Sequence, residues 1–155
     1  MRHDEIPNEL RSLAYDFFFW FSRFEYALKE SRFLKYPNVG DRAEPGWNRF
    51  ISEWKDRYRL SRAGQALIAA NPRRQVVTAG ELDFQDLGFD PRASELEQVV
   101  RYAQAVRNNL FHGGKHGSAY WNDPERTRTL LATTIAVLDD LAFQTGMSAD
   151  YRSEY

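Results

Sequence analysis

Apolar residues recur along most of the chain at the three- and four-residue spacing of an α-helix, and no strand-like alternation persists. The first stretch predicts a long helix from about Asn8 to Lys35. It carries one apolar stripe between Leu10 and Leu28, and an aromatic stripe of Tyr15, Phe19 and Tyr26 on nearly the opposite side. A helix that is apolar on two sides is buried on both. We favour a central place in a helical bundle, and a second subunit that covers the aromatic stripe is the alternative.

Two shorter helices are predicted next, from about Trp47 to Tyr58 and from about Ala63 to Ala70. Residues 71–92 contain several prolines and glycines, which indicates a long connection with at most a brief extended piece at Gln75–Thr78. Long connections are often functional, and the consecutive Arg73 and Arg74 are candidates for phosphate contacts.

The two remaining helices are marked by their capping residues. Ser94 with Glu97 forms a capping box, which predicts a helix to about His112 that ends at a glycine pair. Asp123 followed by Pro124 predicts the start of a last helix, which continues to about Thr145. The sequence thus predicts one all-α domain over residues 1–155, with loose tails at residues 1–7 and 147–155.

Composition narrows the class of protein. Aromatic residues make up 15% of the chain, so a short sequence can still build a substantial core. The absence of cysteine excludes disulfides and thiolate chemistry. No apolar run could span a bilayer and the N-terminus does not resemble a secretory signal, so we expect a cytoplasmic protein with no membrane partner. The net charge of −1 argues against a protein that coats DNA without regard to sequence.

One charged residue interrupts the apolar stripe of the predicted 94–112 helix. Arg107 projects inside that stripe, although a guanidinium keeps its proton and is costly to bury without a partner. We therefore expect that the helix faces a polar cleft there, or that an acid lies beside the guanidinium. Glu25 of the first helix is the first choice for this acid and Asp16 is the alternative. An arginine that only ties two helices together explains the position equally well.

Asn108 and His112 lie one helical turn apart and project together. His112 falls in the last turn, so it is either a capping histidine or a titratable imidazole at an open helix end beside Lys115. Arg107 and His112 are separated by roughly 140° on an ideal helix. They can meet only if the helix end unwinds, if the arginine reaches round, or if a second copy completes the site.

The segment 107–115, RNNLFHGGK, resembles the R-N-x-x-x-H signature of the HEPN superfamily (higher eukaryote and prokaryote nucleotide-binding). It is similar to the form found in small prokaryotic members, including the Apea-like group. Residues 21–25, FSRFE, also resemble the aromatic and acidic pattern of the first helix of those members. The order of elements agrees over most of the chain. A subgroup carries a tyrosine two residues after the histidine, and here that position is Gly114.

The resemblance implies a four-to-five-helix bundle that forms a two-fold homodimer, with two copies of the motif facing each other. Many members are metal-independent endoribonucleases of toxin–antitoxin, CRISPR-associated or phage-defence systems. Arg107, Asn108 and His112 would then be catalytic, leaving 2′,3′-cyclic phosphate and 5′-hydroxyl ends. The expected partners are RNA, a twin subunit and an antitoxin or defence protein, without a cofactor. Three cations would contact RNA phosphates: Lys115, Arg73 and Arg74.

Other functions are weaker on this sequence. His112 and His116 have the spacing of zinc ligands, but the glycine pair breaks the helix that would align them. Glu9, Asp16 and Glu25 lack a matching acidic set, so a two-metal nuclease is not supported. The main alternative is a non-catalytic HEPN module that binds a nucleotide, RNA or a protein. A helical antitoxin-like protein is a third hypothesis.

Overall fold

The computed structural model describes residues 5–112 and 123–153, and this part of the chain is mostly helical, as predicted. The helices are α1 (Asn8–Glu30), α2 (Trp47–Trp54), α3 (Arg62–Ala70), α4 (Glu95–His112), α6 (Pro124–Gln144) and α7 (Ser148–Arg152). The strands β1 (Arg74–Val77) and β2 (Leu82–Gln85) form a hairpin.

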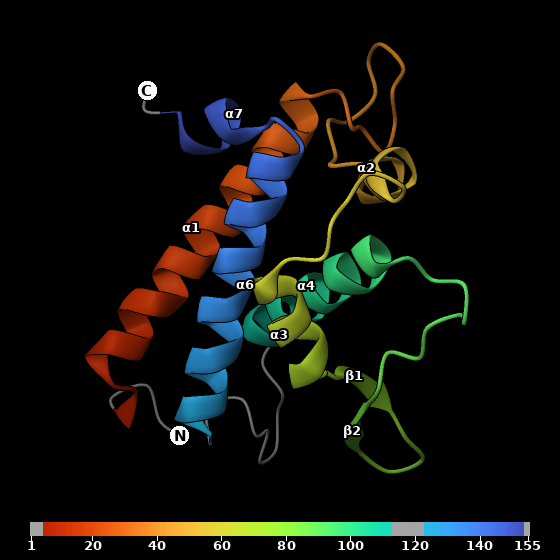
Figure 1. Cartoon of the computed structure of the whole chain (residues 1–155). Coiled ribbons are helices and arrows are strands. Elements are labelled where there is room, and N and C mark those ends of the chain that lie inside the picture. The colour runs from red at the N-terminus through yellow and green to blue at the C-terminus, as the bar shows by residue number, and fades with distance from the viewer. Residues whose placement is uncertain (1–4, 113–122, 154–155) are drawn as a thin grey trace.

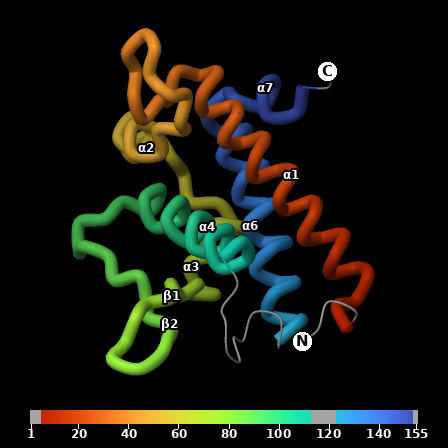
Figure 2. The backbone as a smooth tube through the Cα atoms, turned by 180° about the vertical axis from the view of Figure 1, so that it is seen from behind, coloured from red at the N-terminus to blue at the C-terminus, as the bar shows by residue number. Residues whose placement is uncertain are grey.

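The long helices α1 and α6 pack side by side and run in the same direction, while α4 crosses this pair (Figure 1). Helix α3 packs against both α4 and α6, and the hairpin lies beside α4, away from α1 (Figure 2). Large side chains fill the space between these helices, and Phe17, Phe24, Phe50 and Leu138 are fully buried among them. The core therefore positions α4 so that its last turns approach both α1 and the hairpin.

The apolar stripe and the aromatic stripe of α1 differ in burial. The apolar stripe from Leu10 to Leu28 is buried in the core, as predicted. On the opposite side Tyr15 is 66% and Phe19 is 42% exposed, so the prediction that this chain buries both sides of the helix is wrong. Whether a second subunit covers the aromatic stripe stays a prediction.

Helix α1 ends at Glu30, earlier than predicted. Arg32 adopts a positive φ of 64°, and the Phe33 N–H donates to the Leu28 carbonyl at 2.8 Å, which closes the last turn. The chain then turns into an extended pairing, in which the Gly46 N–H donates to the Phe33 carbonyl at 2.7 Å. Periodicity alone continued the helix because Phe33, seven residues after Tyr26, still falls on the aromatic stripe.

Both predicted N-caps are confirmed. The Ser94 hydroxyl accepts from the Glu97 N–H at 3.1 Å, and Asp123 Oδ1 accepts from the Arg126 N–H at 3.0 Å. Each bond satisfies one of the amide groups left free at a helix start, and such a cap contributes on the order of 1 kcal/mol. The caps therefore fix where α4 and α6 begin.

The connection between α3 and α4 is more ordered than predicted. The extended piece near Gln75 is one strand of a hairpin, and Gln75 pairs with Phe84 in antiparallel register. The hairpin is tied to α4, because Asn109 Nδ2 donates to the Arg73 carbonyl at 2.7 Å and Tyr102 Oη bonds to Asn71 Oδ1 at 3.0 Å. These contacts hold the two consecutive arginines against the end of α4.

The prediction of a loose tail after Gly146 is wrong. Helix α7 buries Tyr151 completely against α1, where its ring lies 5.1 Å from the ring of Trp20. Arg23 of α1 donates to the Tyr151 carbonyl at 3.2 Å and to the carbonyl of Asp150. A single aromatic residue and two hydrogen bonds to backbone carbonyls leave almost no periodic signal in a segment of this length.

Candidate functional site at the end of helix α4

One face of α4 opens into a hollow of about 380 Å³, here called the central pocket. Arg101, Gln104, Asn108 and His112 line it from α4. Their spacing of three and four residues places them on one side of the helix. Asn108 and His112, which the sequence placed together, therefore share one pocket, and both are exposed to solvent.

The hairpin side supplies the opposite wall through Arg74, Gln75 and Leu87. Arg74, Arg101 and His112 bring basic groups to the pocket, and no acidic residue lines it in the described part of the chain. Arg101 is fixed by neutral partners, since its guanidinium donates to the side-chain oxygens of Asn48 and Gln104. Its positive charge is therefore positioned without being neutralised by those bonds.

Arg107 points away from this pocket and toward α1. Its guanidinium carbon lies 5.4 Å from the ring centre of Phe111 and 5.9 Å from that of Phe21. The faces of these two rings contact the guanidinium in place of the predicted carboxylate. The guanidinium nevertheless stays linked to the pocket, because Arg107 Nη1 donates to Asn108 Oδ1 at 3.1 Å.

The expected acidic partner of Arg107 is wrong. Glu25 accepts a hydrogen bond from Trp47 Nε1 at 3.2 Å, and Asp16 is exposed on α1. Among the described residues neither carboxylate forms an ion pair with Arg107. The wheel projection placed Glu25 beside the apolar stripe of α1, but in the fold the indole of Trp47 from α2 lies on that side and donates to its carboxylate.

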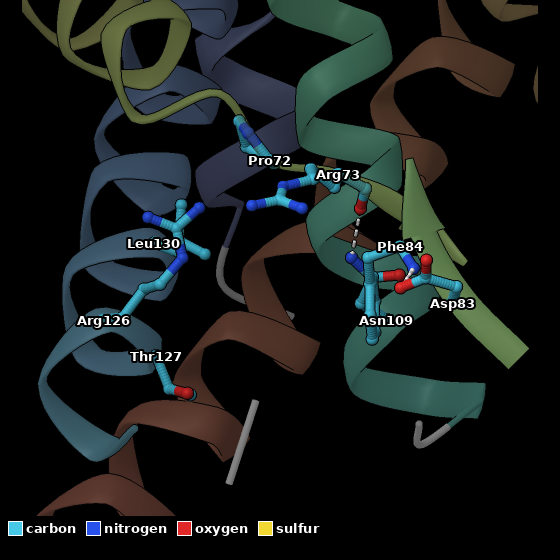
Figure 3. A pocket seen from close by; sticks show the side chains of 8 residues that line it. All are labelled: Pro72, Arg73, Asp83, Phe84, Asn109, Arg126, Thr127 and Leu130. Atoms are coloured by element: carbon cyan, nitrogen blue, oxygen red, sulfur yellow. Dashed lines mark hydrogen bonds between the residues drawn. The ribbon is translucent and has the colours of Figure 1, made fainter. Parts of the chain in front are cut away.

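Arg73 lies in a neighbouring pocket of about 210 Å³, here called the hairpin pocket, together with Phe84, Asn109 and Arg126. Figure 3 shows the guanidinium of Arg73 extending toward α6, from which Arg126 projects, while Phe84 and Asn109 form the other side. Asn109 is only 8% exposed and lines both pockets. The consecutive Arg73 and Arg74 thus line two adjoining pockets rather than one.

Several lining residues were not singled out from the sequence. Arg101 and Gln104 follow from the helical period, since they precede Asn108 by seven and four residues on the same face. Phe84 and Arg126 had no comparable signal. Their place depends on how the hairpin and α6 pack on α4, which is a tertiary contact.

The remaining predicted residue, Lys115, lies outside the described residues, as does His116. Among the residues that are described, no three His, Asp or Glu side chains come together as ligands for a metal ion. None of the described helices combines the length and the apolar character needed to cross a bilayer.

Comparison of this chain with known protein families, with curated proteins and with solved structures gave no match in any of the three searches.

Proposed function

We propose that this chain is a HEPN-type endoribonuclease that cleaves RNA without a metal ion. The observation that supports this most is the central pocket, where an exposed imidazole, His112, shares one hollow with Asn108 and the cations Arg74 and Arg101. A pocket whose described lining includes basic residues and no acid suits a phosphodiester. A histidine is the side chain that most often transfers protons in catalysis.

The proposed reaction is an attack of the ribose 2′-oxygen on the adjacent phosphorus. A base takes the 2′-hydroxyl proton, the bond from phosphorus to the 5′-oxygen breaks, and an acid protonates that leaving oxygen. The products are a 2′,3′-cyclic phosphate and a 5′-hydroxyl. Arginine side chains bind the charge that builds on the equatorial oxygens of phosphorus, and Asn108 orients the phosphate or ribose.

A two-fold homodimer would supply the second proton-transfer group, the same histidine of another copy. Exposed aromatic side chains beside the motif support this part of the proposal. Phe18 and Phe111 pack together with ring centres 5.7 Å apart, yet remain 48% and 47% exposed. Such paired rings at the surface are common at protein interfaces.

The alternative, a non-catalytic HEPN module that binds RNA or a protein, is favoured by one observation. Arg107 packs between aromatic rings and does not line the central pocket. If Arg107 has only this structural role, the pocket retains binding groups but loses the cation that the motif assigns to the reaction.

The deciding experiment incubates RNA with wild-type protein and with His112→Ala in excess chelator. The nuclease proposal expects wild-type cleavage with cyclic-phosphate and 5′-hydroxyl ends, and a loss of about 10²–10⁴-fold in rate for the variant. Equal thermal unfolding temperatures show that the variant is folded. Ends that carry a 3′-hydroxyl, or a rate unaffected by His112→Ala, contradict the proposal.

A further inference from the structure

Three hollows adjoin one another along α4. The hairpin pocket and the central pocket share Asn109. The central pocket in turn shares Arg101 and Gln104 with a third hollow of about 360 Å³, which the segment around Lys35 and Arg49 completes. Arg101 and Asn109 are eight residues apart on one helix, so these shared walls are separated by roughly 12 Å along its axis. These three adjoining hollows are together called the α4 groove here.

The α4 groove is basic although the chain as a whole carries a net charge of −1. Two acidic residues, Asp83 and Glu44, line it. Six arginine and lysine side chains line it as well, two or more in each hollow: Arg73, Arg126, Arg74, Arg101, Lys35 and Arg49. A row of cations on an otherwise slightly acidic protein fits a ligand with regularly spaced negative charges.

The hairpin pocket differs from the other two because it has an aromatic wall. Phe84 and the buried Leu130 and Pro72 give it apolar sides. Its volume of about 210 Å³ is below the range of about 300–1,000 Å³ that is typical for pockets enclosing a whole drug-sized molecule. It suits a single flat ring system held at the end of a longer chain.

The charges around this ring site are positioned by the protein. Arg126 Nη2 donates to the Ala70 carbonyl at 3.0 Å, and Arg73 Nε lies 3.8 Å from Asp86 Oδ1. Asp83 Oδ1 accepts from the N–H of Phe84 in its own strand at 2.7 Å. Two guanidinium groups thus stand beside an aromatic face, which is the combination that binds a base together with its phosphate.

We propose that the α4 groove binds a single strand of RNA that crosses the central pocket, with one base against Phe84 and the neighbouring phosphate between Arg73 and Arg126. The inference deepens the proposed ribonuclease function and rests on it, because His112 lies in the central pocket. A base can enter the hairpin pocket only when it is unstacked, so the ligand is single-stranded rather than double-helical. The hairpin pocket then selects a nucleotide that flanks the cleavage position.

The test measures binding separately from cleavage. Protein carrying His112→Ala is titrated into a labelled single-stranded RNA of about ten nucleotides, and anisotropy gives the dissociation constant. Phe84→Leu removes the ring but keeps apolar volume, and should weaken binding by about 5- to 100-fold. Arg126→Gln keeps a donor for the Ala70 carbonyl, and should lower the slope of log K against log salt by about 0.7.

Matched controls separate these effects from general damage. Phe143→Leu alters another phenylalanine, which is 77% exposed on α6 and lines none of the three hollows. Arg128→Gln removes a cation that lies two residues from Arg126 and forms ion pairs with Glu125 and Glu9. Both controls should bind the labelled strand as tightly as the His112→Ala parent, and all variants should retain its unfolding temperature.

The outcomes distinguish the inference from the function on which it rests. If Phe84→Leu and Arg126→Gln bind as their controls do, or if double-helical RNA of equal length binds as tightly as the single strand, the inference is overturned. No binding of the single strand by the parent overturns it as well. If wild-type protein cleaves no RNA while Phe84→Leu still weakens binding, the nuclease proposal fails and the groove remains a binding surface.

Discussion

The guanidinium of Arg107 donates from Nη1 to the side-chain oxygen of Asn108 at 3.1 Å, although the two residues face different sides of α4. Arg107 sits between the rings of Phe21 and Phe111, whereas Asn108 lines the central pocket with His112. The amide of Asn108 therefore connects the aromatic contact on α1 with the pocket that holds the imidazole. In this arrangement Arg107 is linked to the pocket through a hydrogen bond to its neighbour.

The first prediction follows from this link. Arg107→Ala and Asn108→Ala should each reduce RNA cleavage, and the double variant should lose less than the sum of the two losses. Residues in one hydrogen-bond network show interaction energies of about 0.5–3 kcal/mol. A double-mutant cycle on kcat/KM measures this energy. Additive losses would mean that Arg107 and Asn108 act independently, for example because Arg107 enters the site of a second copy.

The second prediction concerns Arg101, which the neutral side chains of Asn48 and Gln104 hold in the wall of the central pocket. Arg101→Gln should weaken RNA binding and lower its salt slope by about 0.7, because one phosphate contact is lost. Titrations at several salt concentrations measure the slope. Arg92→Gln, an exposed arginine that lines none of the described hollows, should leave it unchanged. An equal effect of both changes would point to net charge alone.

The third prediction concerns stability at high pH. Burial of the phenol raises the pKa of Tyr151 above its ordinary value, and the Asp139 carboxylate raises it further. A pKa that is higher in the folded than in the unfolded protein gives stability that is complete below about pH 10 and is lost as the pH rises further. Denaturant unfolding should therefore show a free energy that falls by up to about 1.4 kcal/mol per pH unit from this residue.

Tyr151→Phe should remove this part of the alkaline loss and keep the ring packed against Trp20. Tyr15→Phe is the matched control, since Tyr15 is 66% exposed on the same helix that α7 covers. The free energy of unfolding of each variant is compared between pH 8 and pH 11. A slope for Tyr151→Phe as steep as that of the wild type would contradict the prediction.

The fourth prediction concerns Gly46, which precedes α2. A Cβ atom at this position would lie 2.6 Å from the Leu34 carbonyl carbon and 2.7 Å from its oxygen, both of them backbone atoms. Gly46→Ala should therefore destabilise the fold by about 1–3 kcal/mol, because the paired backbone must move apart. Gly80→Ala is the control, since a Cβ there meets no atom within 4 Å. Equal unfolding midpoints of Gly46→Ala and Gly80→Ala in denaturant would contradict the prediction.

The sequence predicted the helices well where local chemistry sets their limits. Ser94 and Asp123 mark helix starts because a side-chain oxygen can satisfy a free amide only a few residues away. The prediction was wrong where the decisive partner is distant in sequence. The end of α1 depends on pairing with the segment at Gly46, and the burial of Tyr151 depends on contacts with Trp20 and Arg23.

The candidate site divides in the same way. The period of one helix was enough to place Asn108 beside His112, and it would also have placed Arg101 there. It correctly separated Arg107 from His112 on α4. It could not find the partners of Arg107, because aromatic faces and carboxylates on α1 are both reasonable neighbours of a guanidinium until packing decides between them.

The sequence by itself therefore determined the helical class, the caps of α4 and α6, and the face of α4 that carries the imidazole, because each depends on residues within a turn or two. Only the tertiary structure decided that a hairpin faces this helix, that Arg73 and Arg74 enter separate pockets, and that Phe84 and Arg126 line one of them. These features depend on packing between segments far apart in the chain. The spacing of residues within one segment does not predict such contacts.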